Sequence, residues 1–269
     1  MPELPEVETV RRVLKKDLIG QRIIDIESNY TKMILEPFEQ FKSNLLGAKF
    51  KDILRKGKFL IFKLDNGYNL IAHMRMEGKF FLEEKGSMNN KHIHVIIHLT
   101  DYDLYYQDTR KFGIMVTRSD DDLFKTSPLI NVANDPIEGI DKTVLYNNLL
   151  KRKKTIKEAL LDQSIISGLG NIYVDEVLYM SHILPTRQAS KVTLDEVNDI
   201  INHSKEIFLK SIEHGGTTIK SFTSSKNHAG SFQDFLLVHT KDVCPNCNNK
   251  LTIIKIGGRS SYFCNKCQK

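Results

Sequence analysis

Residues 58–74 read KFLIFKLDNGYNLIAHM, in which two apolar runs are separated by Asp65-Asn66-Gly67. Short runs rich in Ile, Leu, Phe and Tyr are typical of β-strands, and Asp, Asn and Gly in succession indicate a turn. This stretch therefore predicts two short strands separated by a tight turn.

The same pattern recurs along the first 130 residues. Six further runs of this composition are RIIDIE, KFKDIL, KFFLEE, HIHVIIHL, LYYQD and FGIMVT. Many short strands without intervening helices favour an antiparallel sandwich or barrel. We therefore predict a β-rich domain over residues 1–130.

A helix is predicted to precede these strands. Val7, Val10, Leu14 and Leu18 recur at helical spacing, and Gly20 follows as a stop signal.

Helical patterns replace the strands beyond Pro136. Thr193 and Glu196 form a capping box at the start of a long amphipathic helix that Gly215-Gly216 ends. Its apolar face comprises Leu194, Val197, Ile200, Ile201, Phe208 and Ile212. We predict a helical domain over residues 131–232, which includes a polar loop, either a linker or a lid, at Ser221–Ser231.

All four cysteines lie in a third predicted domain, residues 233–269. They form CPNC and CNKC motifs separated by sixteen residues, the spacing of a zinc ribbon. Four thiolates complete a closed tetrahedral structural site, whereas unligated cysteines or a redox pair would not need two such motifs. We expect one structural zinc ion on Cys244, Cys247, Cys264 and Cys267. Between the motifs, two strands joined by Gly257-Gly258 predict a β-hairpin with Arg259 at its tip, placed to bind phosphate or simply solvated.

Composition narrows the class of protein. The 269 residues include 39 Lys+Arg and 33 Asp+Glu, and the net charge of +6 favours a polyanionic partner such as nucleic acid or an anionic membrane surface. The apolar runs are too short to span a bilayer, and Glu3, Glu6 and Glu8 stand where a signal peptide would carry basic and apolar residues. We expect a cytoplasmic protein without a membrane partner.

A second candidate site lies in KRKKTIKEALLDQSIISGLGNIYVDEVLY. A basic cluster, Lys151 to Lys154 with Lys157, precedes Gly168-Leu169-Gly170-Asn171. We predict that Asn171 is the N-cap of the helix that follows, and helix N-termini beside lysines bind phosphate. An ordinary helix hairpin with a solvated basic edge is the alternative.

Three stretches of the β-rich domain carry further candidates. Lys58 begins a strand after Gly57, Met76 lies near a strand end, and Arg110 alternates with Phe112. Each has an ordinary interpretation as a solvated or core residue.

Six motifs occur together and in order: PELPEVET, HMRMEG, DTRKFG, GLGNIYVDE, GGTT and CNKCQK. In this combination the chain resembles the bacterial formamidopyrimidine-DNA glycosylases, a family of helix–two-turn–helix DNA glycosylases. The resemblance implies an α+β multidomain chain with an N-terminal antiparallel β-sandwich, a helix–two-turn–helix domain and a zinc-finger hairpin. It also implies a bacterial monomer that acts in base excision repair on double-stranded DNA containing oxidised bases. Such an enzyme removes oxidised purines (8-oxoguanine and formamidopyrimidines) and nicks the abasic site by β,δ-elimination.

The resemblance assigns roles to individual residues. Pro2 corresponds to the nucleophile that forms a Schiff base, Glu3 to the acid beside it, and Lys58 and Arg259 to proton donors in the elimination steps. The residues that fill the gap left by an everted base are Met76, Arg110 and Phe112. The further DNA contacts are His92, Arg152, Lys157 and Asn171.

Two stretches depart from the family pattern. LLVHTKD lacks the usual aromatic-glycine-basic triplet, and the loop at Ser221–Ser231 has its own composition.

Two other interpretations compete. An endonuclease VIII-like enzyme would remove oxidised pyrimidines with the same terminal proline, but that type begins Pro-Glu-Gly-Pro-Glu, whereas Leu4 stands here. A non-catalytic zinc-ribbon DNA-binding protein would need the basic helices and the cysteines but not Pro2.

Overall fold

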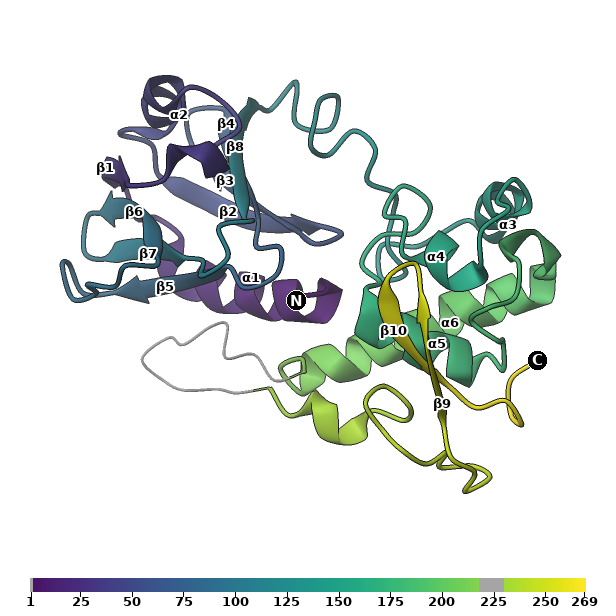
Figure 1. Cartoon of the computed structure of the whole chain (residues 1–269). Helices are drawn as coiled ribbons and strands as arrows, with labels where there is room; N and C mark the ends of the chain where they lie inside the picture. The colour runs from purple at the N-terminus through teal and green to yellow at the C-terminus, as the bar shows by residue number, and fades with distance from the viewer. Residues whose placement is uncertain (1, 218–229) are drawn as a thin grey trace. The chain divides into compact units, whose positions relative to one another are not determined.

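Two four-stranded antiparallel sheets form the first part of the chain in the computed structural model, which describes residues 2–217 and 230–269 (Figure 1). One sheet has the order β1-β6-β7-β5 and the other β2-β3-β4-β8. The strands are β1 (Ile23–Ser28), β2 (Phe50–Lys56), β3 (Phe59–Leu64), β4 (Tyr68–His73), β5 (Lys79–Glu83), β6 (Ile93–Leu99), β7 (Asp103–Gln107) and β8 (Ile114–Ser119). All eight predicted strands are confirmed, and the architecture is a sandwich rather than a barrel.

The turn between β3 and β4 has the predicted chemistry. Gly67 has a φ of 82°, in the left-handed region that glycine adopts without steric cost. The Asn66 side chain accepts the N–H of Tyr68 at 3.1 Å, so the turn is closed by its own residues.

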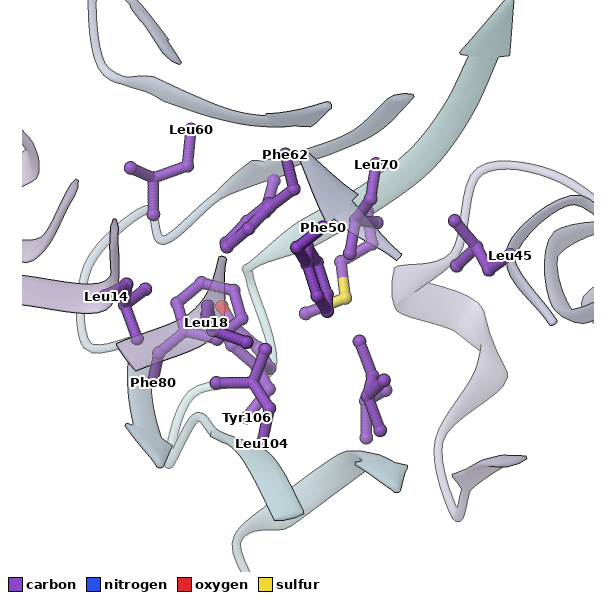
Figure 2. Packing of buried hydrophobic residues seen from close by; sticks show 14 of the residues in the cluster. Leu14, Leu18, Leu45, Phe50, Leu60, Phe62, Leu70, Phe80, Leu104 and Tyr106 are labelled. Atoms are coloured by element: carbon purple, nitrogen blue, oxygen red, sulfur yellow. The ribbon is translucent and has the colours of Figure 1, made fainter. Parts of the chain in front are cut away.

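Aromatic rings fill the space between the two sheets (Figure 2). Phe50 and Phe62 of one sheet meet edge to face at 5.9 Å, and Phe62 contacts Phe80 of the other sheet at 5.6 Å. Phe80 in turn packs against Tyr106 at 4.9 Å. These tilted contacts join the sheets through a continuous core, to which Leu14 adds the apolar face of the first helix.

That first helix, α1 (Leu4–Leu18), packs against β2 and β3. It begins one residue before Pro5 because Glu3 and Glu6 form a capping box, in which Glu6 accepts the N–H of Glu3 at 2.9 Å. The sequence pattern did not predict α2 (Phe38–Leu45) or the 3₁₀ turn η1 (Thr31–Met33).

Helices dominate the second part of the chain. They are α3 (Lys142–Leu150), α4 (Ile156–Leu160), α5 (Asn171–Met180) and α6 (Leu194–Glu213), with 3₁₀ turns η2 (Ala189–Lys191) and η3 (Phe232–Phe235). The predicted capping box of Thr193 and Glu196 opens α6. Tyr173 of α5 packs against Phe208 of α6 at 5.5 Å, which buries the faces that the two helices share.

The predicted C-terminal hairpin is also present, as β9 (Thr252–Ile256) and β10 (Arg259–Phe263). It packs on α5, so the hairpin and the helices form one compact unit, residues 131–217 with 231–269. The sandwich belongs to the other unit, which reaches Ile130. Division of the second unit into two domains stays a prediction, and most of the loop predicted at Ser221–Ser231 lies outside the described residues. None of the described helices combines the length and the apolarity needed to cross a bilayer.

Candidate functional site

The start of α1 brings two predicted site residues to the edge of the sandwich. Pro2 is buried, and Glu3 is 1% exposed at the N-cap of α1. A carboxylate held at a helix N-terminus lies in the favourable end of the helix dipole. The local sequence therefore fixes the backbone of this segment before any ligand binds.

A cluster of charges around the buried carboxylate of Glu8 clamps α1 to β2. Glu8 accepts hydrogen bonds from Arg11 and Arg12 at 2.8 Å and lies 3.3 Å from the Nε of Arg55 in β2. Burial alone would raise the pKa of Glu8, but the hydrogen bonds from Arg11 and Arg12 lower it to about 2. Arg55 also donates to the carbonyl of Gly57 at 3.0 Å, so the clamp extends to the turn that carries Lys58.

Lys58 lies in the turn between β2 and β3 and is 7% exposed. Its positive charge acts on His73 at the end of β4: burial, together with the charges of Arg75 and Lys58, lowers the pKa of His73 to about 3. The N–H of Arg75 donates to Nδ1 of His73 at 2.9 Å, which places the ring proton on Nε2. His73 is therefore a neutral neighbour of Lys58 at physiological pH.

Two loops of the sandwich expose the residues expected to fill the gap of an everted base. The first, residues 74–78, carries Met76, and the second, residues 108–113, carries Arg110 and Phe112. Met76 is 38% exposed and Phe112 is 52% exposed, which is high for large apolar side chains. The guanidinium of Arg110 lies 4.9 Å from the centre of the Phe112 ring.

Each loop contains a strained backbone position next to these side chains. Arg75 has a φ of 53° and Lys111 a φ of 58°, values that residues with a Cβ rarely adopt. Such strain persists only where the surroundings enforce it, and it concentrates at functional sites.

Asp108 holds the second loop in this conformation. Its carboxylate is fully buried and accepts the N–H groups of Arg110, Phe112 and Gly113 at 2.8 to 3.0 Å. The N–H of Asp108 donates to the carbonyl of His92 at 2.9 Å, so His92, another expected DNA contact, lies directly beside this loop.

The two loops contact each other around Tyr106. A Cβ on Gly78 would lie 2.1 Å from the Tyr106 hydroxyl oxygen, and one on Gly113 would lie 1.7 Å from it. Only glycine fits on either side of this ring. The Thr109 hydroxyl donates to Glu77, which links the loops a second time.

Besides the cysteines, four predicted site residues lie in the second unit. Arg152 is exposed within the basic run and lies 3.9 Å from Asp162, a distance typical of a weak surface ion pair. Lys157, in contrast, is completely buried. Asn171 and Arg259 lie next to the same residue, Ser260. The Asn171 amide donates to the carbonyl of Ser260 at 3.0 Å, and Arg259 directly precedes Ser260 in the chain.

One prediction about Asn171 is wrong. The N-cap of α5 is Gly170, and Asn171 is the first helical residue. The extended backbone of Gly170 (φ of −128°) starts the helix, while the Asn171 side chain is directed to the hairpin instead of capping the helix.

The four cysteine sulfurs lie within 4.8 Å of one another. Two of the cysteines precede β9 and two follow β10. Sulfurs at the corners of a tetrahedron around zinc are about 3.8 Å apart. Cys244 and Cys267 are separated by 3.8 Å, and Cys247 and Cys264 by 3.5 Å, so the set fits zinc. Burial opposes ionisation of Cys244, but hydrogen bonds from the Tyr179 hydroxyl and from backbone N–H groups lower its pKa to about 6, which favours the thiolate that metals bind.

Three family models match successive parts of the chain. They are the formamidopyrimidine-DNA glycosylase N-terminal domain over residues 1–115, the formamidopyrimidine-DNA glycosylase H2TH domain over residues 132–223, and the zinc finger found in FPG and IleRS over residues 241–269. The chain belongs to the formamidopyrimidine-DNA glycosylase family.

Individual members of the family are similar over their whole length. The chain is 44% identical to the formamidopyrimidine-DNA glycosylase of Mycoplasma mobile, covering 100% of this chain and 99% of that protein. It is 42% identical to the one of an Exiguobacterium species, with full coverage of both. The crystal structure of Lactococcus lactis Fpg with DNA containing N7-benzyl-Fapy-dG matches with a TM-score of 0.93 at 39% identity, and the complex with abasic-site DNA with a TM-score of 0.92 at 38%, both over 100% of each chain.

Family membership decides two points that the sequence left open. The cysteines are the ligands of a structural zinc ion, as in the family's zinc finger, rather than a redox pair. A simple zinc-ribbon DNA-binding protein is set aside, because the match extends over the sandwich as well as the finger.

Several residues important to the site were missed by sequence reasoning. Asp108 and Asp175 stand inside the motifs DTRKFG and GLGNIYVDE, yet their roles depend on partners that they meet only in the folded chain: backbone N–H groups for Asp108 and the Lys157 ammonium for Asp175. Tyr106 and Glu8 are similar cases. Gly113, the last residue of DTRKFG, was the available signal for a close contact.

Proposed function

We propose that the chain is a bifunctional DNA glycosylase that removes oxidised purines from double-stranded DNA and then cleaves the abasic site. The observation that carries this proposal is the position of Pro2, which is buried beside the capped start of α1. The charges around Glu8 join this helix to the turn that bears Lys58. The Lactococcus lactis relatives were crystallised with DNA containing Fapy-dG or an abasic site, which supports both the substrate class and the lyase step. We also propose a monomer that works on DNA in the bacterial cytosol, since its named relatives are bacterial.

The nucleophile is the secondary amine of Pro2 after removal of Met1. An α-amino group has a pKa of about 8, so a useful fraction is neutral near pH 7, whereas a lysine amine at about 10.4 is almost entirely protonated. The neutral amine attacks C1′ of the damaged nucleotide, and the base leaves with the electron pair of the glycosidic bond and takes up the proton that the attacking amine loses. Glu3 donates a proton to the ring oxygen as the sugar opens, which leaves an iminium between Pro2 and C1′.

The iminium then acts as an electron sink for two eliminations. Loss of a proton from C2′ expels the 3′ phosphate, and a second proton loss expels the 5′ phosphate. Because proline is a secondary amine, the iminium nitrogen carries no hydrogen, so it cannot become a neutral imine by losing a proton. Its charge is neutralised only when C2′ is deprotonated, and it returns as each phosphate leaves. Lys58 and Arg259 are the proposed donors that serve these steps.

Base removal requires that the nucleotide leave the stack, which costs a few kcal/mol. Met76 and Phe112 are exposed apolar side chains on preformed loops, suited to fill the vacated space, and Arg110 offers hydrogen bonds to the orphaned partner base. Arg152 and the basic run beside it are proposed to bind phosphate.

Borohydride trapping tests the nucleophile and the substrate together. Duplexes carrying 8-oxoguanine, a formamidopyrimidine, thymine glycol or no lesion are incubated with the protein and reduced, and the cross-linked peptide is sequenced. We expect adducts on Pro2, formed mainly with the two purine lesions. Preference for thymine glycol would support the endonuclease VIII-like alternative, and an adduct on any lysine would exclude Pro2 as the nucleophile.

A further inference from the structure

The zinc-finger hairpin is attached to the helices through a buried ion pair, which meets β10 at Ser260 and Tyr262. The Lys157 ammonium of α4 lies 2.7 Å from the Asp175 carboxylate of α5, and neither side chain is exposed to solvent. Breaking such a pair leaves one charge buried without its partner, whereas keeping it adds little to stability over apolar side chains. A geometric role accounts for its presence better than a stabilising one.

Both members of the pair reach the hairpin. Lys157 donates to the carbonyl of Ser260 at 3.0 Å, and the N–H of Tyr262 donates to Asp175 at 3.3 Å. Asn171 donates to the same Ser260 carbonyl. Ser260 and Tyr262 are two residues apart, so these backbone groups share one edge of β10, the edge that β9 does not cover. The ion pair therefore occupies the edge of β10 that β9 leaves unpaired.

The chain that enters the finger is held by the same turn of α5. Asp175 contacts Nδ1 of His239 at 2.8 Å, and the adjacent Glu176 accepts the N–H groups of Leu237, Val238 and His239 at 2.7 to 2.9 Å. The imidazole of His239 in turn packs against Tyr262 at 4.9 Å. These contacts lie in the stretch that departs from the family's aromatic-glycine-basic pattern, where Thr240 has a φ of 62°, a conformation usual for glycine.

Arg259 is the first residue of β10, directly before Ser260. On its other side, Gly257 lies against α4, since a Cβ there would be 3.1 Å from Cγ of Glu158. The backbone on either side of Arg259 is thus fixed by α4 and α5, while the cysteines fix the far end of the strand.

We propose that Lys157 and Asp175 are positioning residues that fix β10, and with it Arg259, independently of the metal. For Arg259 this rests on the proposed function, in which its side chain serves elimination. Lys157 then acts through the Ser260 carbonyl. It would not neutralise a phosphate, in contrast to the role that the resemblance implies.

The test compares Asp175→Asn and Lys157→Met with Arg259→Ala and with Lys205→Met, a change of an exposed lysine on α6. An amide has one acceptor oxygen where the carboxylate has two, so Asp175→Asn loosens β10 while keeping the shape. Zinc content, exchange of the Tyr262 amide hydrogen, and the ratio of β- to β,δ-elimination products from a preformed abasic duplex are measured for each variant.

We expect full zinc content with at least tenfold faster exchange at Tyr262 in the Asp175→Asn and Lys157→Met variants. We also expect a loss of the second elimination that approaches the loss in Arg259→Ala. If Arg259→Ala leaves the products unchanged, the proposed role of Arg259 fails, and the exchange rate alone decides the positioning role. Unchanged exchange at Tyr262 would overturn that role. A salt dependence of DNA binding reduced by about one phosphate in Lys157→Met, but not in Lys205→Met, would instead assign Lys157 to the DNA.

Discussion

Single buried carboxylates fix the three segments that carry proposed site residues: the helix α1, the loop of Arg110 and Phe112, and the strand β10. Glu8 joins α1 to β2, Asp108 closes the loop of Arg110 and Phe112, and Asp175 holds β10. A carboxylate can accept several N–H groups at once, and its burial is tolerated only when these bonds are made. Each of these residues therefore fixes a local geometry that neutral side chains of similar size would leave loose.

The clamp at Glu8 predicts a specific dependence of stability on pH. The pKa of Glu8 is about 2 in the folded protein and returns to its ordinary 4.5 on unfolding, so its contribution is complete above pH 4.5 and lost as the pH falls toward 2. Glu8→Gln should lower the free energy of unfolding by about 2–3 kcal/mol at pH 7. Urea unfolding of the sandwich at pH 7 and at pH 3 measures this difference.

The control for this prediction is Glu39→Gln, a change of an exposed acid on α2. The penalty of Glu8→Gln should shrink at pH 3, and Glu39→Gln should have little effect at either pH. An equal penalty at both pH values would mean that packing, and not the charge of Glu8, joins α1 to β2.

Helices and strands were predicted from the sequence where their apolar residues form a clear local pattern. The eight strands of the sandwich are short apolar runs separated by turn signals, and the helix α6 repeats its apolar residues with the helical period; both patterns are local properties of the sequence. The helix α2 was missed, because with only Phe41 and Leu45 buried in eight residues it carries too little pattern to stand out among strands. The contacts of Asp108 and Asp175 could not be predicted, since their partners depend on loop geometry and on segments distant in sequence.

The two loops around Tyr106, residues 74–78 and 108–113, are proposed to fill the gap left by an everted base. Substitution of Met76 tests this proposal. Met76→Ala should slow excision from a fully paired lesion by about tenfold, because only eversion of the base is impaired. Excision of the same lesion from single-stranded DNA, where it is already unstacked, should change by less than about twofold. Equal losses on both substrates would identify Met76 as an ordinary packing residue.

Gly113 tests the fit between the two loops. The Cβ of Gly113→Ala would lie 1.7 Å from the hydroxyl oxygen of the buried Tyr106, so the loop of Phe112 must shift. We expect a stability loss of about 1–3 kcal/mol and the same selective loss on paired lesions as in Met76→Ala. Adding Tyr106→Phe removes the hydroxyl oxygen, the atom nearest to the new Cβ, and should restore part of the lost stability and part of the lost excision activity. Unaltered stability and excision in Gly113→Ala would show that the loops adjust freely.

At the scale of the whole molecule, the residues proposed to act in catalysis come from two compact units. Pro2, Glu3 and Lys58 belong to the sandwich unit, and Arg259 belongs to the unit of helices and finger. The aromatic core of the first unit is built from its own strands and helices, without the finger. Loss of the metal should therefore affect the two units very differently.

Cys264→Ser tests this division. Removing one thiolate opens the tetrahedral site, and since metal binding contributes directly to the folding of such fingers, the end of β10 should lose its order. We expect loss of zinc, at least tenfold weaker binding to all duplexes, and an unchanged unfolding transition for the sandwich. Elemental analysis, binding at fixed salt and urea unfolding measure these, with Lys266→Ser, a change of an exposed neighbour, as the matched control. Weak binding with full zinc content would point to a direct contact of Cys264, whereas a sandwich that unfolds together with the finger would mean that the two units depend on each other for stability.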